Sequence, residues 1–351
     1  MWPARPFAML GIRCRHVPRR MSPTPFGVGN TSTMVHTSDA TDGRLWIGIE
    51  CAATFLRGIV CEASGEVITQ RQRPLTGHAP AEAVAAVRAL VAELAATESD
   101  PALFGGVGLA LPGNLNRATD RCESNTLWSS VVLDELRPCG ALGTARLVSR
   151  ATAALLGEYR CGVAQGCQTV VYVEVGPELS AAMLHAGQLW TGATGIAGAI
   201  GYDSVDVDGD LTLQERVGSE GLIRRAKERM YRDRTSSLSR RGIPRDREIG
   251  LEDLLTMARL GDELAQVIIA RAGVHLGIAA ARLINLLNPE LLIIGGDLVS
   301  AGEVLLAPIR AEVERRTAPS ALAVCRLLPA TVGAAVGAAQ AARQEALSTA
   351  A

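Results

Sequence analysis

The same order of short strands and a helix occurs twice along this chain, and this repetition restricts the fold more than any other feature. In the first copy the strand patterns fall at 45–49, 56–61 and 67–69, a helix pattern falls at 79–96, and a further strand pattern falls at 106–110. Alternating apolar residues indicate the strands, and apolar residues at helical spacing indicate the helix. The first half is therefore predicted to open as a β-meander followed by a helix and a strand.

The second copy begins with a β-rich run at 169–175. A hairpin follows at 180–185 and 188–190 around Ala186-Gly187, then a long helix at 264–287 that ends at Asn288-Pro289, and a buried strand at 291–294. Helix patterns at 302–316 and 332–343 close the chain. Two such halves predict an α/β protein with two lobes and a cleft between them. The predicted boundaries are a leader at 1–43, an N-terminal lobe at 44–148 and a C-terminal lobe at 149–351.

Composition agrees with a soluble protein of this size. The 351 residues are 48% hydrophobic and include 36 glycines, but only 3% are aromatic. A chain of this length can form two lobes with separate cores. Apolar runs are too short for a bilayer, so no membrane span is expected. Eight scattered cysteines favour reduced thiols in a cytoplasm over a disulfide framework.

The charge distribution excludes a general affinity for nucleic acid. The formal net charge is −1, which provides no basic field for a phosphate backbone. The first 38 residues contain no Asp or Glu but five arginines and five prolines, which is typical of a disordered leader, of a start codon assigned too early, or of a targeting peptide. This segment is too short and too rich in proline for a helix-turn-helix.

Several segments, in this order and spacing, resemble the ROK family (repressor, open reading frame, kinase). They are Gly106-Val-Gly-Leu-Ala-Leu-Pro-Gly113, Asn125-Thr-Leu-Trp128, Gly192–Gly201 and Leu283–Gly296. The resemblance runs from about residue 45 to residue 343. It implies a two-lobed actin-like ATPase (ribonuclease H-like) fold with a central cleft, and the activity of a sugar kinase or a sugar-responsive repressor.

The residues that such kinases use for nucleotide phosphates are altered here. Active relatives end the first strand with Asp-x-Gly-Gly-Thr, whereas this chain has Glu50-Cys-Ala-Ala-Thr54. Their second phosphate loop, Gly-Thr-Gly-Ile-Gly, corresponds to Gly176-Pro-Glu-Leu-Ser180. Pro177 removes a backbone donor and Glu178 adds a carboxylate. Lys227 is the only lysine, so a P-loop is excluded as well.

The resemblance also assigns the general base, and that residue is lost. The family has an Asn-Asp pair at the start of the Ala-rich helix, and this chain has Ser149-Arg150. A guanidinium does not deprotonate at physiological pH, so Arg150 cannot take a proton from a sugar hydroxyl. The family's Glu-Ile-Gly-His sugar clamp is replaced by Ala199–Tyr202. Its zinc-binding cysteines have no counterpart between Asp203 and Gly221, so no structural zinc is expected.

The sequence therefore predicts a site without catalytic residues and without a metal. The expected sites are ligand contacts at Asn125, Arg150, Tyr202 and Glu215, and weaker nucleotide contacts at Thr54, Gly295 and Gly296. Three interpretations have a structural alternative: an ion pair with Glu174 or Glu178 for Arg150, a strand-to-helix turn for Gly295-Gly296, and core packing for Trp128 in the Asn125–Trp128 segment. The aspartates from Asp203 to Asp210 are interpreted as a solvated turn, and His78, His185 and His275 receive no role.

The leading hypothesis is a non-catalytic, cytoplasmic ROK protein that senses a sugar or sugar phosphate and regulates transcription as a pseudokinase. Relatives suggest a homodimer, and DNA would be reached only through an upstream segment or a partner protein. The alternative is a glucokinase-like or cyclitol kinase with a rearranged site, using Glu50, Glu158 or Asp203 as the base; ATP and magnesium are expected only in that case. A third hypothesis is a structural partner that stabilises an active homologue.

Overall fold

The computed structural model describes residues 43–75, 79–116, 119–124, 126–204, 211–232 and 249–350. The predicted leader, apart from Gly43, lies outside these residues. Asn125, His78 and residues 205–210 of the aspartate-rich turn also lie outside them. Everything below concerns the described part of the chain.

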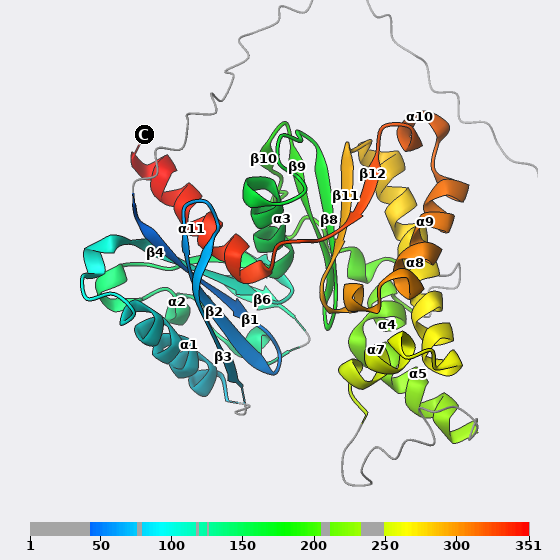
Figure 1. Cartoon of the computed structure of the whole chain (residues 1–351), viewed down its shortest axis with the longest axis horizontal. Helices are drawn as coiled ribbons and strands as arrows, with labels where there is room; N and C mark the ends of the chain where they lie inside the picture. Colours follow the sequence, from blue (N-terminus) through cyan, green and yellow to red (C-terminus); the bar gives the residue numbers. More distant parts are fainter. Residues whose placement is uncertain are drawn as a thin grey trace, which may run out of the picture. The chain divides into compact units, whose positions relative to one another are not determined.

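The first half forms a five-stranded sheet in the order β3-β2-β1-β4-β7 (Figure 1). Its strands are β1 (Leu45–Cys51), β2 (Phe55–Glu62), β3 (Val67–Pro74), β4 (Phe104–Leu111) and β7 (Arg146–Ser149). β1 pairs antiparallel with β2 and parallel with β4, which pairs parallel with β7. The carboxyl ends of β1, β4 and β7 therefore meet at one edge.

The second half repeats this topology. Its sheet has the order β10-β9-β8-β11-β12, and its strands are β8 (Val170–Val175), β9 (Leu179–His185), β10 (Gln188–Leu189), β11 (Leu291–Gly295) and β12 (Arg326–Pro329). β8 pairs antiparallel with β9 and parallel with β11. The predicted turn joins β9 to β10, with left-handed backbone at Ala186 (φ 51°) and Gly187 (φ 71°). The prediction of two similar halves is confirmed.

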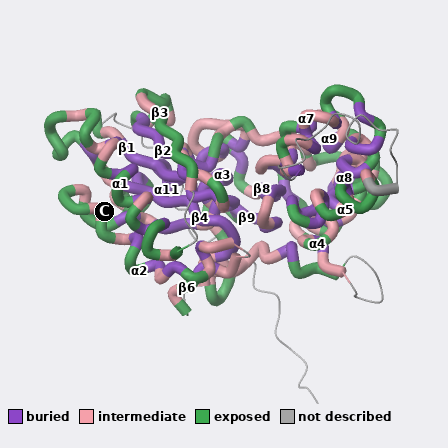
Figure 2. Tube along the Cα trace, turned by 90° about the horizontal axis from the view of Figure 1, so that it is seen from below, coloured by how far each residue is buried: buried purple, intermediate pink, exposed green. Residues whose placement is uncertain are grey.

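Helices cover both sheets. They are α1 (Pro80–Ala95), α2 (Leu133–Leu136), α3 (Arg150–Cys161), α4 (Leu213–Val217), α5 (Ser219–Arg232), α7 (Leu251–Arg259), α8 (Glu263–Leu287), α9 (Glu303–Arg316), α10 (Pro319–Leu322) and α11 (Ala334–Ala350). A two-stranded sheet of β5 (Asn114–Asn116) and β6 (Arg121–Glu123) follows β4. Buried stretches run through both sheets and the helices that pack on them (Figure 2).

The long helix α8 belongs to the core of the second half. Its residues Ile268, Leu276 and Ile284 are buried with residues of β11, α7 and α9. α8 is also the one helix in the described ranges that is long and apolar enough to cross a membrane, with a mean hydropathy of 1.7. Burial of 56% of that window is typical of a core helix.

The last helix, α11, packs on the first sheet although it comes at the end of the chain (Figure 1). Its Ala335, Ala339 and Ala342 form a small apolar cluster with Trp46 of β1. A side chain at Gly48 of β1 or at Gly108 of β4 would overlap the backbone of α11. Small residues on both sides therefore allow this helix to lie directly on the sheet.

Glu158 fixes α3 to the segment that leads into α11. Its side chain is fully buried and accepts hydrogen bonds from the Val163 N–H (2.8 Å), the Val332 N–H (2.6 Å), the Thr331 N–H and the Thr331 hydroxyl (3.0 Å). Both carboxylate oxygens are thus occupied by donors from the protein. Such an arrangement satisfies the hydrogen-bonding capacity of a buried carboxylate and gives Glu158 a structural role.

We predict that Glu158→Ala lowers the free energy of unfolding by about 2 to 4 kcal/mol, because it leaves several buried N–H groups without acceptors. Chemical denaturation at pH 7 measures this change. Glu66→Ala, which removes an exposed carboxylate between β2 and β3, is the matched control and should cost less than about 0.5 kcal/mol. Equal losses in the two variants would contradict the structural role.

Candidate functional site

Arg150 is the first residue of α3 and lies at the carboxyl edges of both sheets. Ser149 precedes it and caps the helix, with its hydroxyl oxygen accepting from the Thr152 N–H at 3.1 Å. β7 ends at Ser149, so Arg150 lies directly after the carboxyl end of this strand. Ligand sites of α/β proteins form at this edge of their parallel strands. Only 6% of Arg150 is exposed.

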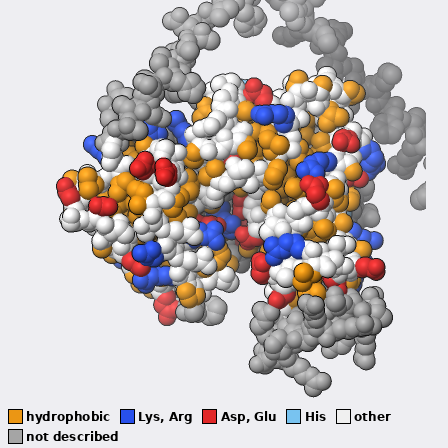
Figure 3. Space-filling view, in the orientation of Figure 1, with side chains coloured by type: hydrophobic (Ala, Val, Ile, Leu, Met, Phe, Trp, Pro, Cys, Tyr) orange, Lys and Arg blue, Asp and Glu red, His pale blue; other side chains and the backbone are white. Residues whose placement is uncertain are grey.

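Three carboxylates surround the Arg150 guanidinium. Its Nη2 lies 3.0 Å from Glu50 Oε1, 3.0 Å from Glu174 Oε1 and 3.5 Å from Asp297 Oδ1. Glu50 comes from the end of β1, Glu174 from the end of β8, and Asp297 from the turn after β11. Acidic and basic side chains also gather in the hollow near the centre of the face drawn in Figure 3. We call these four residues the Arg150 cluster.

Burial and charge act in opposite directions within the Arg150 cluster. Burial disfavours the charged guanidinium, but the attraction of Glu174, Glu50 and Asp297 outweighs this effect and raises the pKa of Arg150. Burial raises the pKa of Glu174, and Arg150 offsets only part of that rise. The Tyr172 hydroxyl, buried beside it, hydrogen bonds to Glu174. Arg150 is therefore a permanent cation that holds acidic groups, and the predicted ion pair with Glu174 is confirmed.

Glu178, the other partner considered for Arg150, instead accepts a hydrogen bond from the Ser124 hydroxyl at 3.0 Å. Glu50 has a second cation beside it, since Arg57 Nη1 lies 3.3 Å from Glu50 Oε2. Arg57 is 37% exposed at its side chain, so this pair lies at the margin of the buried group.

The turn that corresponds to the first phosphate loop is closed by its own hydrogen bonds. The Ala52 N–H donates to the Phe55 carbonyl (2.9 Å), and the Ala52 carbonyl accepts from the Trp128 indole N–H (2.9 Å). Trp128 is fully buried, which confirms its interpretation as a packing residue. Thr54 is exposed, and its carbonyl accepts from the Leu75 N–H. A nucleotide contact at Thr54 stays a prediction.

The loop at 176–180 is held by the helix pair that follows β10. The Leu179 N–H donates to Gln214 Oε1, and Gln214 Nε2 donates to the Pro177 carbonyl, both at 2.6 Å. The Ser219 N–H donates to the Gly176 carbonyl at 3.1 Å. Gln214 thus clamps the loop from both sides. No sequence motif singled out this residue, although it directly precedes Glu215.

Gly295 and Gly296 lie against β8. A side chain at Gly295 would overlap the Tyr172 hydroxyl, and one at Gly296 (φ 88°) would come within 2.5 Å of the Val175 carbonyl oxygen. These contacts favour the interpretation of the pair as a strand-to-helix turn that needs glycine for close packing. Nucleotide binding at the two glycines is not tested by this geometry and stays a prediction.

Tyr202 and Glu215, which were expected to contact the sugar, form no hydrogen bond or ion pair with the Arg150 cluster in the described chain. Tyr202 is 73% exposed, and Asp203 beside it is exposed. Glu215 is exposed and forms a capping box with Thr212, whose N–H and hydroxyl both donate to Glu215 Oε2 (2.7 and 2.9 Å). These bonds lower the pKa of Glu215. Its ligand role therefore competes with a local structural one.

The three residues named as bases of a rearranged kinase have different surroundings. Glu158 accepts hydrogen bonds from four protein donors, so a role as base would require these bonds to be released. Glu50 is ion-paired to two arginines, and Asp203 lies on the surface. In the described ranges, no group of three or more His, Cys, Asp or Glu side chains is arranged to hold a metal ion.

Three buried polar atoms beside the strand ends have no hydrogen-bond partner in the described chain: Arg150 Nε, the Ser219 hydroxyl oxygen, and Glu174 Oε1, which is ion-paired to Arg150. Arg150 Nε and the Ser219 hydroxyl are donors. Both groups can donate to a ligand oxygen. Arg150 and Ser219 therefore leave donors that the described chain does not use. The site offers no unpaired carboxylate at the position of the family's base.

Comparison with known proteins agrees with this fold. The ROK family model matches residues 46–345. A glucokinase of Thermotoga maritima is 29% identical over 289 residues, covering 78% of this chain and 88% of the relative. A xylose repressor of Caldicellulosiruptor bescii is 24% identical over 283 residues, covering 77% and 70%.

Among solved structures, a ROK family glucokinase from Streptomyces griseus in complex with glucose and AMPPNP superposes with a TM-score of 0.74 at 24% identity, covering 86% of this chain and 98% of that one. A ROK family transcriptional regulator, a homologue of E. coli MLC protein, gives 0.73 at 22%, covering 87% and 79%. Kinases and repressors are thus both among the relatives. With its two repeated halves and a family match across most of its length, the chain belongs to the ROK family and has its actin-like α/β fold.

Proposed function

We propose that this chain is a non-catalytic ROK protein that binds a sugar or sugar phosphate and regulates rather than phosphorylates. The observation that carries the proposal is the position of Arg150. It stands where the resemblance places the general base, and its charge is already engaged by three carboxylates. A group that cannot accept a proton does not activate a sugar hydroxyl for attack on a phosphate.

Electrostatics around Arg150 support the same proposal. Glu50, Glu174 and Asp297 carry up to three negative charges against the charges of Arg150 and, at the margin, Arg57, at the strand ends where the resemblance places the phosphate loops. Two like charges 4 Å apart repel by about 4 kcal/mol at the effective dielectric constant typical of protein surfaces. A polyphosphate that entered here would meet an excess of negative charge. The only lysine of the sequence, Lys227, lies in α5 and not at these strand ends.

The two loops add a steric and hydrogen-bonding argument. Phosphate loops bind through free backbone N–H groups. Here the Ala52 and Leu179 N–H groups already donate within the protein, and Pro177 has none. The loops therefore offer a nucleotide fewer donors than the glycine-rich loops that the resemblance describes.

Binding of a sugar or sugar phosphate rests on the donors that remain. Arg150 Nε and the Ser219 hydroxyl are buried and have no hydrogen-bond partner in the described chain, and both can donate to the hydroxyl oxygens of a sugar. Asn125, Tyr202 and Glu215 complete the proposed ligand contacts. In this proposal the protein acts in the cytoplasm as a homodimer. It reaches DNA through an upstream segment or a partner protein, by analogy with the xylose repressors among its relatives.

A kinase with a rearranged site is the second candidate, because glucokinases are among the curated relatives. In that case Glu50 is the best-placed base, since it lies in the Arg150 cluster, whereas Glu158 is saturated by donors. Glu50 would first have to leave both Arg150 and Arg57. ATP and magnesium would be required only in this candidate function.

We predict that the purified protein, given ATP, magnesium and a panel of hexoses, forms sugar phosphate at least about a hundredfold more slowly than an active ROK glucokinase assayed beside it. General-base catalysis contributes about 10²- to 10⁴-fold, which sets this margin. A coupled ADP-release assay with direct detection of the sugar phosphate provides the measurement. Turnover comparable to that of the glucokinase would refute the non-catalytic proposal.

Thermal-shift measurements should separate sugar binding from nucleotide binding. A hexose or hexose phosphate at a hundred- to thousandfold excess over its dissociation constant is expected to stabilise the fold by roughly 2 to 4 kcal/mol, while ATP with magnesium leaves the melting temperature unchanged. Stabilisation by ATP alone would point to the kinase candidate instead. Absence of any sugar effect would remove the sensing function.

Replacing Arg150 should make stability strongly dependent on pH. Arg150→Met leaves three carboxylates without their buried partner, so we expect a loss of about 3 to 5 kcal/mol at pH 7.5. Burial already raises the pKa of Glu174, and loss of the cation that offsets part of this rise makes the native state bind more protons at this group than the unfolded state. Stability must then fall as the pH rises, and the deficit must shrink as the pH is lowered toward the ordinary glutamate value of 4.5.

The matched control for this prediction is Arg57→Met. It removes the half-exposed partner of the same Glu50 and should cost no more than about 1 kcal/mol with little dependence on pH. Urea denaturation of both variants between pH 5 and 8 is the measurement. A deficit in Arg150→Met that does not change over this range would show that the three carboxylates are not held by Arg150.

A further inference from the structure

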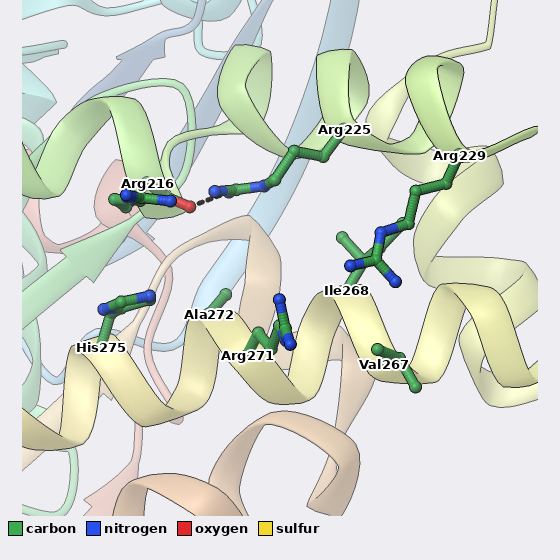
Figure 4. A pocket seen from close by; sticks show the side chains of 8 residues that line it. All are labelled: Arg216, Arg225, Arg229, Val267, Ile268, Arg271, Ala272 and His275. Carbon is green, nitrogen blue, oxygen red and sulfur yellow. Dashed lines mark hydrogen bonds between the residues drawn. The ribbon is translucent and has the colours of Figure 1, made fainter. Parts of the chain in front are cut away.

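A second concentration of positive charge lies between α5 and α8, away from the Arg150 cluster. A cavity of about 60 Å³ is lined there by Arg216, Arg225, Arg229, Arg271 and His275, with Val267, Ile268 and Ala272 as its apolar wall. Figure 4 shows Arg225 and Arg229 projecting from α5 and Arg271 and His275 from α8 toward the same space. We call this cavity the arginine pocket.

Three of the arginines that line the arginine pocket have no acidic partner among the described residues. No carboxylate lines the pocket, and Arg225, Arg229 and Arg271 form no ion pair among the described residues. Arg225 donates to the Arg216 backbone carbonyl, which fixes its guanidinium at the pocket (Figure 4). Like charges held this close repel one another, so an arrangement of this kind favours a bound anion.

The half-buried His275 provides an independent sign of the same field. Burial first, and then the charges of Arg216, Arg225 and Arg271, lower the pKa of His275 below its ordinary value of 6.5. Its Nδ1 is buried and has no hydrogen-bond partner in the described chain. A neutral imidazole with an unsatisfied buried nitrogen, next to several guanidinium groups, is a group that a bound oxyanion can engage.

From this geometry we propose that the arginine pocket binds a tetrahedral oxyanion, the phosphate group of a small phosphorylated metabolite or inorganic phosphate itself. The volume decides the class of ligand. About 60 Å³ accommodates a few water molecules or one phosphate group, but not a nucleotide or a sugar ring. Any sugar portion must therefore extend out of the pocket into solvent. This site is separate from the proposed sugar site and does not rest on the function proposed for it.

Isothermal titration of the full chain with sulfate, inorganic phosphate and glucose 6-phosphate, at constant ionic strength in sodium chloride, tests the proposal. We expect saturable binding of one anion per chain that Arg229→Gln and Arg271→Gln each weaken at least tenfold. Arg282→Gln is the matched control, since it removes an exposed arginine of the same α8 outside the pocket and should leave binding unchanged. Tighter binding of glucose 6-phosphate than of phosphate identifies a metabolite as the source, and equal binding identifies the free anion.

The proposal is overturned if anion binding does not saturate, or if Arg282→Gln loses as much affinity as the pocket variants. Either result would indicate a general attraction between opposite charges. Sulfate adds a readout through His275, since sulfate does not titrate in this range. A bound anion offsets the field that Arg216 from α4, Arg225 from α5 and Arg271 from α8 exert on His275, while Glu228 of α5 acts on Arg225. The pKa of His275 then rises, so sulfate affinity must increase as the pH falls below about 6.5.

His275→Gln should bind sulfate with an affinity that no longer changes with pH over this range. Circular dichroism of each variant confirms that it is folded. If the pH dependence persists in His275→Gln, His275 is not part of the site. If both arginine variants bind the anion as well as the wild type does, the proposed site is wrong.

Discussion

The central interaction of this molecule is the buried contact between one guanidinium and three carboxylates at the strand ends. Placing a cation at the first position of a helix is unfavourable, because the helix dipole is positive there. Burial adds a further penalty. Glu50, Glu174 and Asp297 overcome both, and each comes from a different strand end, so the cluster joins β1, β8 and the turn after β11 to the start of α3. The interaction thus links segments from both halves of the chain at one point.

The duplicated topology explains why such a link exists at this point. In both sheets the first strand of the meander lies centrally, paired antiparallel with the second strand and parallel with a later one. The ends of β1 and β8 are therefore equivalent positions of two similar halves. In relatives these positions lead into phosphate loops, and here they carry Glu50 and Glu174. A carboxylate at each end requires a cation between them, and Arg150 provides it.

Local patterns predicted most strands and helices, since apolar periodicity is a local property. The strand β3 was expected only at 67–69 but continues to Pro74, because Gln70 to Arg73 face solvent and leave no apolar alternation to detect. The family resemblance identified the position of Arg150, and one of its partners, Glu174, was named from charge alone. Asp297 and Gln214 were not found, because lateral contacts between distant segments leave no spacing signal in one sequence. The sequence offered one indication for Asp297: it is a polar residue shortly after a parallel strand, where α/β proteins often place site residues.

The same limit applies to the arginine pocket, where the sequence showed an arginine-rich helix and an isolated histidine but not their meeting between α5 and α8. The structure connects this pocket to the loop at 176–180 through one short helix. In α4, Gln214 clamps that loop and Arg216, two residues later, lines the pocket. Gln214 and Arg216 thus place a clamp on the loop at 176–180 and a lining residue of the arginine pocket in the same five-residue helix.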